Sequence, residues 1–407
     1  MIEQLYKRDK SPKANIKAVT KKKCNRCLST NIYKDNYGSY HCLDCYQYGL
    51  ISDQMTIYRF DREIIHTNHI LNMDYNLTEL QEKGSKFLLD CYQAKEPGFL
   101  QAVCGAGKTE MTYKVILEAL NHNQKVCFVI PRVQVLKEVK KRFYDSFPKT
   151  TIGLLYEGNK HYENAQLIFS TPQQLIYFYD EFDLIILDEV DAFPYSGNEF
   201  LKRLVKKSLK STGVHIYMSA TICEDDKEEL KNYKTFLIPS RYHKRPLAIP
   251  SFIKIGDRKD IYRKIKKYLD KNHMDGKKTL LFVPTIKMGI EVNKTLQEKG
   301  YDSQFISSNT KYKYEVTASF RNNNFNFLVT TTVLERGVTF KDIDCFVLFA
   351  DHMVFTKETL IQISGRVGRD VLYPEGQILF FSEYTSKAMK LAKNEIIYMN
   401  CRNSFEV

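Results

Sequence analysis

The chain has 407 residues, 43% of them hydrophobic, and carries 61 Lys and Arg against 48 Asp and Glu, a formal net charge of +13. This composition excludes an intrinsically disordered chain, and the length suffices for two ordinary domains plus a small module. The positive balance fits a polyanionic partner such as nucleic acid, but a Lys-rich composition typical of an AT-rich genome gives the same excess.

The first 23 residues contain eight Lys or Arg and two acids, which predicts a flexible basic arm. No apolar stretch of the signal-peptide type follows this arm. No apolar run approaches the roughly 18 residues that cross a bilayer. We therefore expect a cytoplasmic protein whose ten cysteines are free thiols or metal ligands rather than disulfides.

Four cysteines directly after the arm form two CxxC pairs separated by fourteen residues: Cys24, Cys27, Cys42 and Cys45. Four thiolates at this spacing predict a closed, structural Zn²⁺ site of the ribbon or knuckle type. Two interpretations fit the neighbouring tyrosines equally well, since they can stack nucleic-acid bases or pack the small core of the module. These tyrosines are Tyr37, Tyr40, Tyr46 and Tyr48.

Three blocks follow from the alternation of apolar and amphipathic segments: residues 1–70 with the arm and zinc module, residues 71–245 and residues 246–407. The proline-rich segment Pro239–Pro250 is the expected hinge. The strands expected in the second block are Phe99–Cys104, Lys125–Pro131, Gln166–Ser170, Leu184–Leu187 and Val214–Ser219. Those expected in the third are Thr279–Val283, Ser303–Ile306, Phe327–Thr331, Cys345–Phe349 and Gln377–Phe381. Helices such as Ile261–Asn272 and Met288–Lys299 lie between them, so both blocks are expected to form α/β domains with parallel sheets.

A phosphate-binding loop follows the first of these strands and precedes an expected helix, Glu110–Ala119. Glycines let the backbone approach phosphates closely, and the helix N-terminus favours their negative charge. Lys108 is expected to reach the β- and γ-phosphates of ATP, and the Thr109 hydroxyl to bind Mg²⁺. The nucleotide-binding residues expected here are Cys104, Gly105, Ala106, Gly107, Lys108, Thr109 and Glu110.

An apolar strand eighty positions after Lys108 ends in an acidic turn that contains Asp188, Glu189 and Asp191. We expect Asp188 to hold Mg²⁺ and Glu189 to polarise the attacking water. The next strand ends in Ser219, Ala220 and Thr221, which are weak evidence alone but gain value from their place after the acidic turn.

The third block contains the run 362–369, in which Gln362 precedes two arginines separated by glycines. Arg366 and Arg369 are expected to bind the nucleotide phosphates from the second domain, because a guanidinium group stays charged and matches phosphate oxygens. The glycines would be unfavourable inside an ordinary surface helix, so this pattern favours a functional turn.

Together these segments resemble the motifs of superfamily-2 helicases, namely GxGKT, DExD/H, SAT and QxxGRxGR. The resemblance implies two tandem RecA-like domains and an ATPase that moves along nucleic acid. It also implies that Leu77, Thr78 and Gln81 recognise adenine, and that Gly337 lies in the motif that links ATP to nucleic acid. By position, the residues expected to contact DNA phosphates are Arg132, Thr171, Thr285, Thr331 and Thr332, although several of them are equally suited to cap helices.

The N-terminal zinc module, the run from Asp188 to Tyr195 and the short chain after Arg369 are similar to the ComFA family, the late-competence DNA translocases of Gram-positive bacteria. Ile363 stands where many helicases have Arg directly after the Gln of the last motif, which points away from DEAD-box RNA helicases. The resemblance implies a DNA-stimulated ATPase at the inner face of the membrane. It also implies partners: single-stranded DNA, a ComFC-like phosphoribosyltransferase protein and the DNA-entry channel. A homo-oligomer is compatible with the sequence, which leaves the oligomeric state open. A PriA- or RecG-type repair helicase, an RNA helicase and a non-catalytic zinc-dependent scaffold are the alternatives.

Overall fold

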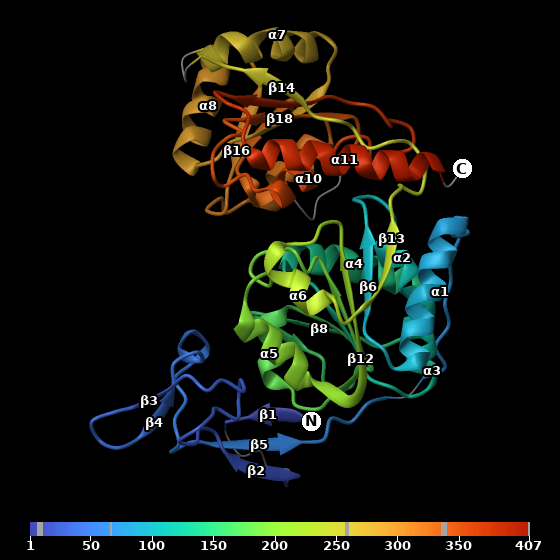
Figure 1. The fold of residues 1–407 in the computed structure, drawn as a ribbon, viewed down its shortest axis with the longest axis vertical. Coiled ribbons are helices and arrows are strands. Elements are labelled where there is room, and N and C mark those ends of the chain that lie inside the picture. The colour runs from blue at the N-terminus through green and yellow to red at the C-terminus, as the bar shows by residue number, and fades with distance from the viewer. Residues whose placement is uncertain (6–10, 66, 257–259, 335–339, 406–407) are drawn as a thin grey trace. The chain divides into compact units, whose positions relative to one another are not determined.

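A computed structural model describes residues 1–5, 11–65, 67–256, 260–334 and 340–405 (Figure 1). The chain divides into two compact units. The first comprises Met1–Gln101 and Lys108–Leu237, and the second comprises Ala102–Gly107 and Ile238–Val407. The N-terminal cysteine module therefore belongs to the same compact unit as the first α/β domain.

The first unit is built on an eight-stranded sheet with the order β13-β6-β12-β11-β7-β10-β8-β9. Its strands are β6 (Gly98–Ala102), β7 (Val126–Val129), β8 (Ile152–Tyr156), β9 (Asn159–His161), β10 (Leu167–Ser170), β11 (Phe182–Asp188), β12 (Leu209–Ser219) and β13 (Lys234–Ile238). Its helices are α1 (Glu79–Ala94), α2 (Lys108–Met111), α3 (Tyr113–Asn121), α4 (Val133–Ser146), α5 (Glu199–Ser208) and α6 (Lys227–Leu230), with short 3-10 turns η2 (Pro172–Tyr177) and η3 (Glu224–Asp226). The pairs from β6 to β8 are parallel, so these strands all end at one edge of the sheet.

The two faces of this sheet are covered by different elements. On one face, Phe143 of α4 packs against Phe128 and Phe169 of the neighbouring strands β7 and β10. On the other face, apolar residues of α5, including Leu201 and Leu204, share a buried cluster with strand residues and with the cysteine module. Because both faces are covered, strands such as β7 and β10 are buried along their whole length, as in other parallel sheets.

The N-terminal segment forms a three-stranded antiparallel sheet with the order β1-β5-β2, from β1 (Ile2–Gln4), β2 (Ala14–Lys17) and β5 (Thr56–Phe60). A hairpin of β3 (Ile32–Lys34) and β4 (Tyr40–Cys42), followed by the 3-10 turn η1 (Tyr46–Tyr48), is inserted between β2 and β5. The prediction of a flexible basic arm is therefore wrong for the described residues. Ile2 packs in the core, and Ala18 and Val19 are fully buried, so apolar burial fixes the segment despite its charge.

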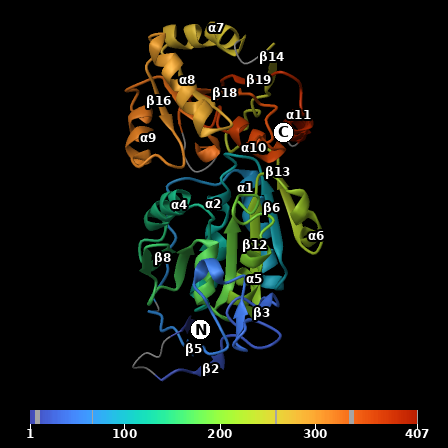
Figure 2. The same cartoon turned by 90° about the vertical axis from the view of Figure 1, so that its left-hand side faces the viewer.

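The second unit contains a six-stranded parallel sheet with the order β14-β19-β18-β15-β17-β16. Its strands are β14 (Ser251–Lys254), β15 (Lys278–Phe282), β16 (Ser303–Ile306), β17 (Phe327–Thr330), β18 (Ile343–Leu348) and β19 (Ile378–Ser382). Its helices are α7 (Asp260–Met274), α8 (Ile286–Glu298), α9 (Lys313–Arg321), α10 (Lys357–Ser364) and α11 (Lys387–Phe405), with the 3-10 turn η4 (Thr332–Leu334). Helices α7 and α8 pack on one face, and α9, α10 and α11 on the other (Figure 2).

The ten strands predicted from apolar runs are all present, with ends shifted by a few residues. Strands β8, β9, β13 and β14 were missed because none of them is a continuous apolar run, and most of them are partly exposed at an edge of a sheet. The single helix predicted over Glu110–Ala119 is wrong in detail, since α2 and α3 are separate and Thr112 lies between them. No helix within the described ranges is both long enough and apolar enough to span a bilayer.

Candidate functional site

The phosphate loop lies between the end of β6 at Ala102 and the start of α2 at Lys108. Gly105 has φ 84° and Gly107 has φ 82°, a conformation that residues with a side chain rarely adopt. The loop therefore requires glycine at these two positions. Its backbone conformation is the kind that turns amide groups toward a phosphate group. Thr109, on the first turn of α2, is buried.

The acidic turn follows β11 at the same edge of the sheet, because β11 runs parallel to β7 and β12. The Glu189 amide donates to the Asp188 carboxylate at 2.9 Å, and Glu189 itself has φ 58°. Burial raises the pKa of Asp188 to about 6, and the nearby charge of Lys108 opposes that rise. Lys108 and Asp188 are thus near enough for their charges to interact, which suits a site that binds phosphate together with a divalent cation.

A direct bond joins the acidic turn to the Ser-Ala-Thr segment. The Thr221 hydroxyl donates to the Asp191 carboxylate, and both side chains are buried. The Thr221 amide donates to the Ser219 hydroxyl at 3.2 Å, which fixes the turn after β12. Ala220 is buried between them. The structure therefore brings together these two predicted segments, which are about thirty positions apart in the sequence.

The segment expected to recognise adenine begins α1. Thr78 is the N-cap of this helix: its hydroxyl accepts from the Gln81 amide at 3.3 Å, and the Gln81 side-chain oxygen accepts from the Thr78 amide at 2.9 Å. This reciprocal capping box explains both residue types without a ligand. Leu77 is half-buried directly before it. Adenine recognition by Leu77, Thr78 and Gln81 stays a prediction.

Glu110, which follows Thr109 on α2, forms an ion pair with Arg142 of α4 at 3.5 Å. This contact gives Glu110 a structural role within the first unit, because it connects the helix after the phosphate loop to a neighbouring helix.

In the second unit, α10 ends at Ser364 and is followed directly by the turn that carries the two arginines. The Arg366 side chain is almost fully buried, whereas Arg369 is partly exposed and its Nε donates to the Gly365 carbonyl at 2.8 Å. Within the same unit, the Cys104 thiol donates to Gln362 Oε1 at 3.0 Å. Because Arg366 is buried, it is not an ordinary arginine on the surface of a helix. Gly337 lies outside the described residues.

Arg241, which the sequence analysis did not select, stabilises the turn that contains Arg366 and Arg369. It is 2% exposed, and its guanidinium group donates to the carbonyl oxygens of Gly368 and Gly365. Burial, with the nearby charge of Arg369, lowers the pKa of Arg241 to about 10. A basic residue in a proline-rich linker resembles a solvated side chain, so the sequence contains no signal that would have identified it.

Residues expected to contact a nucleic acid lie at the carboxyl edges of the two sheets. In the second unit, Phe282, Thr330 and Ile306 are register partners on β15, β17 and β16, so the segments that follow these strands leave the sheet together. Thr285 caps α8, because its hydroxyl accepts from the Met288 amide at 3.2 Å. Thr331 and Thr332 follow β17 and are partly exposed.

In the first unit, Arg132 follows β7 and Thr171 follows β10 at the corresponding edge. Arg132 is partly exposed at the start of α4, whereas Thr171 is buried. A contact between Arg132 and a phosphate group is compatible with this exposure, and the Thr171 hydroxyl would need to become accessible first.

A further segment at the edge of the second sheet was missed. After β16, the chain alternates two lysines, Lys311 and Lys313, with two tyrosines, Tyr312 and Tyr314, which are 68% and 76% exposed. An alternation of cations and exposed rings is suited to backbone contact and base stacking. The signal was visible as a Lys-Tyr-Lys-Tyr run, but only the sheet register shows that the preceding strand, β16, ends at the same edge as the strands that Thr285 and Thr331 follow.

The four module cysteines converge as predicted. Their Sγ atoms all lie within 4.8 Å of one another, and all four residues are buried. The Cys24–Cys45 and Cys27–Cys42 sulfur distances are 3.8 and 3.5 Å. A zinc–sulfur bond of about 2.3 Å places tetrahedral sulfur ligands about 3.8 Å apart, so the residues present fit zinc. No other metal-binding cluster is found among the described residues.

Comparisons with known proteins agree with this arrangement. Residues 74–224 match the family described as type III restriction enzyme, res subunit, and residues 260–371 match the helicase conserved C-terminal domain. Among solved structures, that of Saccharomyces cerevisiae Dbp5 bound to RNA and ADP BeF3 matches with a TM-score of 0.59 at 16% identity, covering 80% of this chain and 92% of the other. The structure of RecG bound to a three-way DNA junction matches with a TM-score of 0.57 at 16% identity, covering 82% of this chain and 47% of the other. At these identities the structures establish the fold, two tandem RecA-like helicase domains.

Two curated proteins are similar over nearly the whole chain. The competence protein ComFA of Streptococcus pneumoniae (strain ATCC BAA-255 / R6) is 38% identical, over 93% of this chain and 90% of its own. The competence protein ComFA of Bacillus subtilis (strain 168) is 31% identical, over 98% of this chain and 90% of its own. The alignment with the Bacillus subtilis protein covers 98% of this chain, so it includes the N-terminal cysteine module as well as the two RecA-like domains.

Proposed function

Because the chain belongs to the ComFA family, whose helicase domains make it an ATP-hydrolysing, helicase-type enzyme, we propose that it draws single-stranded DNA into competent cells. The observation that carries the proposal is the combination of near-complete similarity to two competence proteins with an ATPase centre whose Lys108, Asp188 and Glu189 are all present. A repair helicase or an RNA helicase would share the ATPase centre. Similarity to the two competence proteins over nearly the whole chain is what distinguishes the proposal from these alternatives.

In the proposed reaction, Lys108 and the loop amides bind the phosphates of ATP, and Thr109 and Asp188 hold Mg²⁺. Glu189 orients and polarises the attacking water. Gln362, Arg366 and Arg369 bind the nucleotide from the second unit and stabilise the charge that develops on the phosphate. The Asp191–Thr221 bond supports the idea that Ser219, Ala220 and Thr221 couple hydrolysis to movement along the strand.

The proposed DNA track follows the carboxyl edges of the two sheets, with Arg132 and Thr171 in one unit and Thr285, Thr331 and Thr332 in the other. Contacts of this kind go to phosphates, so the motor would be insensitive to base sequence. We add Tyr312 and Tyr314 to the track, because exposed rings beside lysines are suited to bases that are unpaired.

We further propose that Cys24, Cys27, Cys42 and Cys45 hold a structural zinc ion. The closed, buried four-sulfur arrangement supports this role, because no position is left for a reacting water. From the family relationship alone, we propose that the protein works at the inner face of the membrane with a ComFC-like protein and the DNA-entry channel as partners. Co-purification from competent cells would test this proposal.

The deciding experiment measures ATP hydrolysis by the purified chain alone and with single-stranded DNA, duplex DNA or RNA, with Lys108→Ala as the inactive control. We expect the largest stimulation with single-stranded DNA and none in the control. A larger stimulation by RNA would favour an RNA helicase, and equal turnover in all four conditions would refute the proposed motor.

A further inference from the structure

Helix α5 directly contacts both halves of the cysteine module. This helix follows the acidic turn in the chain and precedes β12, which ends in Ser219. On the side of α5 that faces the module, Phe200 stacks on Tyr48 with ring centres 4.9 Å apart and planes inclined by 7°. Figure 1 shows α5 at the end of the first unit that carries the module.

Arg203 of α5 bridges the two CxxC pairs. Its Nε donates to the carbonyl oxygen of Cys27, in the first pair, at 3.3 Å, and its guanidinium group forms an ion pair with Asp44, which lies between Cys42 and Cys45. One side chain of the RecA-like domain therefore contacts both cysteine pairs, and the separation of these pairs determines whether four sulfurs can meet at one ion.

Lys207 lies one turn further along the same helix and is fully buried. Its ammonium group donates to the Arg26 carbonyl at 2.8 Å and the Ile176 carbonyl at 3.0 Å, and it forms an ion pair with Glu3. The ammonium group of Lys207 therefore contacts the first cysteine pair, strand β1 and turn η2 at the same time. A buried ammonium group with three oxygen partners is a demanding arrangement that a loosely attached module would not maintain.

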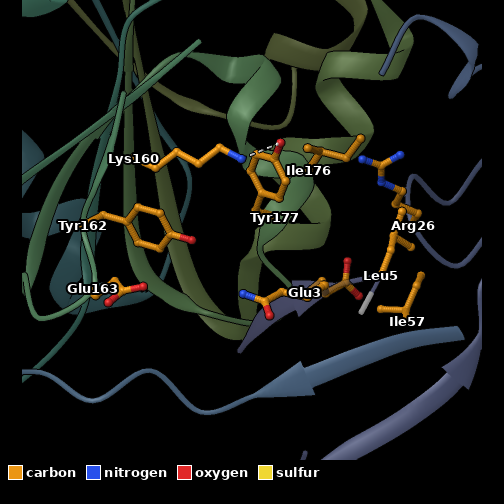
Figure 3. A pocket seen from close by; sticks show the side chains of 10 residues that line it. Glu3, Leu5, Arg26, Ile57, Lys160, Tyr162, Glu163, Ile176 and Tyr177 are labelled. Carbon is orange, nitrogen blue, oxygen red and sulfur yellow. Dashed lines mark hydrogen bonds between the residues drawn. The ribbon is translucent and has the colours of Figure 1, made fainter. Parts of the chain in front are cut away.

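The Lys207 side chain is enclosed, whereas Arg203 and Asp44 are partly exposed to solvent. Glu3, Arg26 and Ile176 line a cavity of about 320 Å³ that also touches Tyr162 and Tyr177 (Figure 3). The Arg26 side chain crosses toward η1, where it donates to the Tyr48 carbonyl at 3.0 Å. The cavity thus lies beside the network, while the contact of Lys207 with the first cysteine pair stays enclosed.

We infer that Arg203 and Lys207 are positioning residues of the four-cysteine centre, and that zinc binding and the stability of α5 are thermodynamically linked. The inference rests on the proposed zinc site. Groups that orient metal ligands commonly change metal affinity by about 10- to 100-fold. The two cations also stand near a centre that four thiolates and Zn²⁺ leave with a net charge of about −2. Because linkage is reciprocal, loss of zinc must loosen α5 as much as loss of α5 contacts loosens zinc.

The test follows zinc transfer from the full-length protein to a chromogenic chelator. Arg203→Gln is compared with Lys206→Met, a matched change on the same helix, because Lys206 points to solvent. We expect Arg203→Gln to release zinc about 10-fold faster than the wild-type protein or more, and Lys206→Met to be unchanged. Asp44→Asn removes the other end of the Arg203 ion pair while leaving α5 intact, so it gives the answer if Arg203→Gln does not fold.

The reciprocal arm measures backbone hydrogen exchange with and without zinc. We expect chelation to raise exchange in α5 and to leave α8 of the second unit unchanged. Wild-type rates of zinc release in both Arg203→Gln and Asp44→Asn, or unchanged exchange in α5, would overturn the inference while the zinc site stood. A wild-type protein that neither holds nor takes up zinc would instead refute the zinc site itself, and the two failures are thereby distinguished.

Discussion

The Thr221 hydroxyl donates to the carboxylate of Asp191, and this bond joins the ends of two neighbouring parallel strands, β11 and β12. Asp191 lies three residues after Asp188, at the candidate Mg²⁺ position, and Thr221 follows the strand that α5 precedes. The bond therefore connects the acidic turn to the segment through which hydrolysis is proposed to be coupled to movement.

Thr221→Val should separate ATP hydrolysis from its stimulation by DNA. The substitution keeps the shape of the side chain but leaves a buried carboxylate without this donor, which costs about 1–3 kcal/mol and lets the two segments move independently. We expect the stimulation by single-stranded DNA to fall about 10-fold or more, a change of about 1.4 kcal/mol in the coupling free energy. Thr221→Ser retains the hydroxyl and serves as the control, so equal stimulation in the two variants would contradict this role.

Replacing Tyr312 and Tyr314 together by Ala should weaken the binding of single-stranded DNA. Stacking contributes about 1–3 kcal/mol per base, so the loss of even one stacked base raises Kd about 5-fold or more. Fluorescence anisotropy with a labelled oligothymidine measures the change. Tyr398→Ala, at an exposed tyrosine of helix α11 in the second unit, is the matched control. If both proteins bind the oligonucleotide with the wild-type Kd, the two tyrosines lie outside the track.

His215 should make the first unit sensitive to acid. Its ring stacks on Tyr217 and Tyr233, which also stack on each other, and burial lowers its pKa below the ordinary value of 6.5; the charge of Glu229 opposes that fall, and Lys206 adds to it. As the pH falls through 6.5, the unfolded chain binds a proton that the folded one does not, so the free energy of unfolding decreases.

The measurement is urea unfolding at neutral pH and at about one unit below the ordinary histidine pKa, where each unit of pH can cost about 1.4 kcal/mol. His215→Phe keeps the stacking and should remove this part of the acid sensitivity. Acid effects on the cysteine centre are common to all variants and cancel. His161→Phe, at an exposed histidine, should leave the pH dependence as it is in the wild-type protein, and an equal change in both variants would argue against His215.

Gly289→Ala should destabilise the second unit. A Cβ atom at this position would meet Phe305 Cε2 at 2.1 Å, so α8 or the ring of Phe305 must shift. Overpacking of this kind costs about 1–3 kcal/mol, which exceeds the usual gain from replacing a helical Gly by Ala. Thermal unfolding measures the loss. Gly256→Ala, where the nearest atom lies at 3.6 Å, is the control, and equal stability of the two variants would show that Phe305 yields freely.

Much of this protein can be predicted from its sequence because the decisive signals are local. Strands that are buried on both faces are continuous apolar runs, and this pattern predicted ten strands of the two sheets, all but β16 in the interior of a sheet. The phosphate loop was recognisable because the two glycines, Lys108 and Thr109 are consecutive, and the four cysteines because ligand spacing is imposed by the ion. The resemblance to the ComFA family is also visible in local features of the sequence, namely the cysteine module and the run from Asp188 to Tyr195.

What only the tertiary structure decided concerns contacts between segments that are distant in the chain. The basic N-terminal segment is held as strands, because Ile2 and Val19 are buried in a core that no composition reveals. In the sequence, Arg203 and Lys207 cannot be distinguished from the other cations of a charged helix. The fold places both of them in contact with the cysteine module. Charge and helical periodicity describe a residue and its neighbours, but the partner that satisfies a buried charge is chosen by the packing of the whole unit.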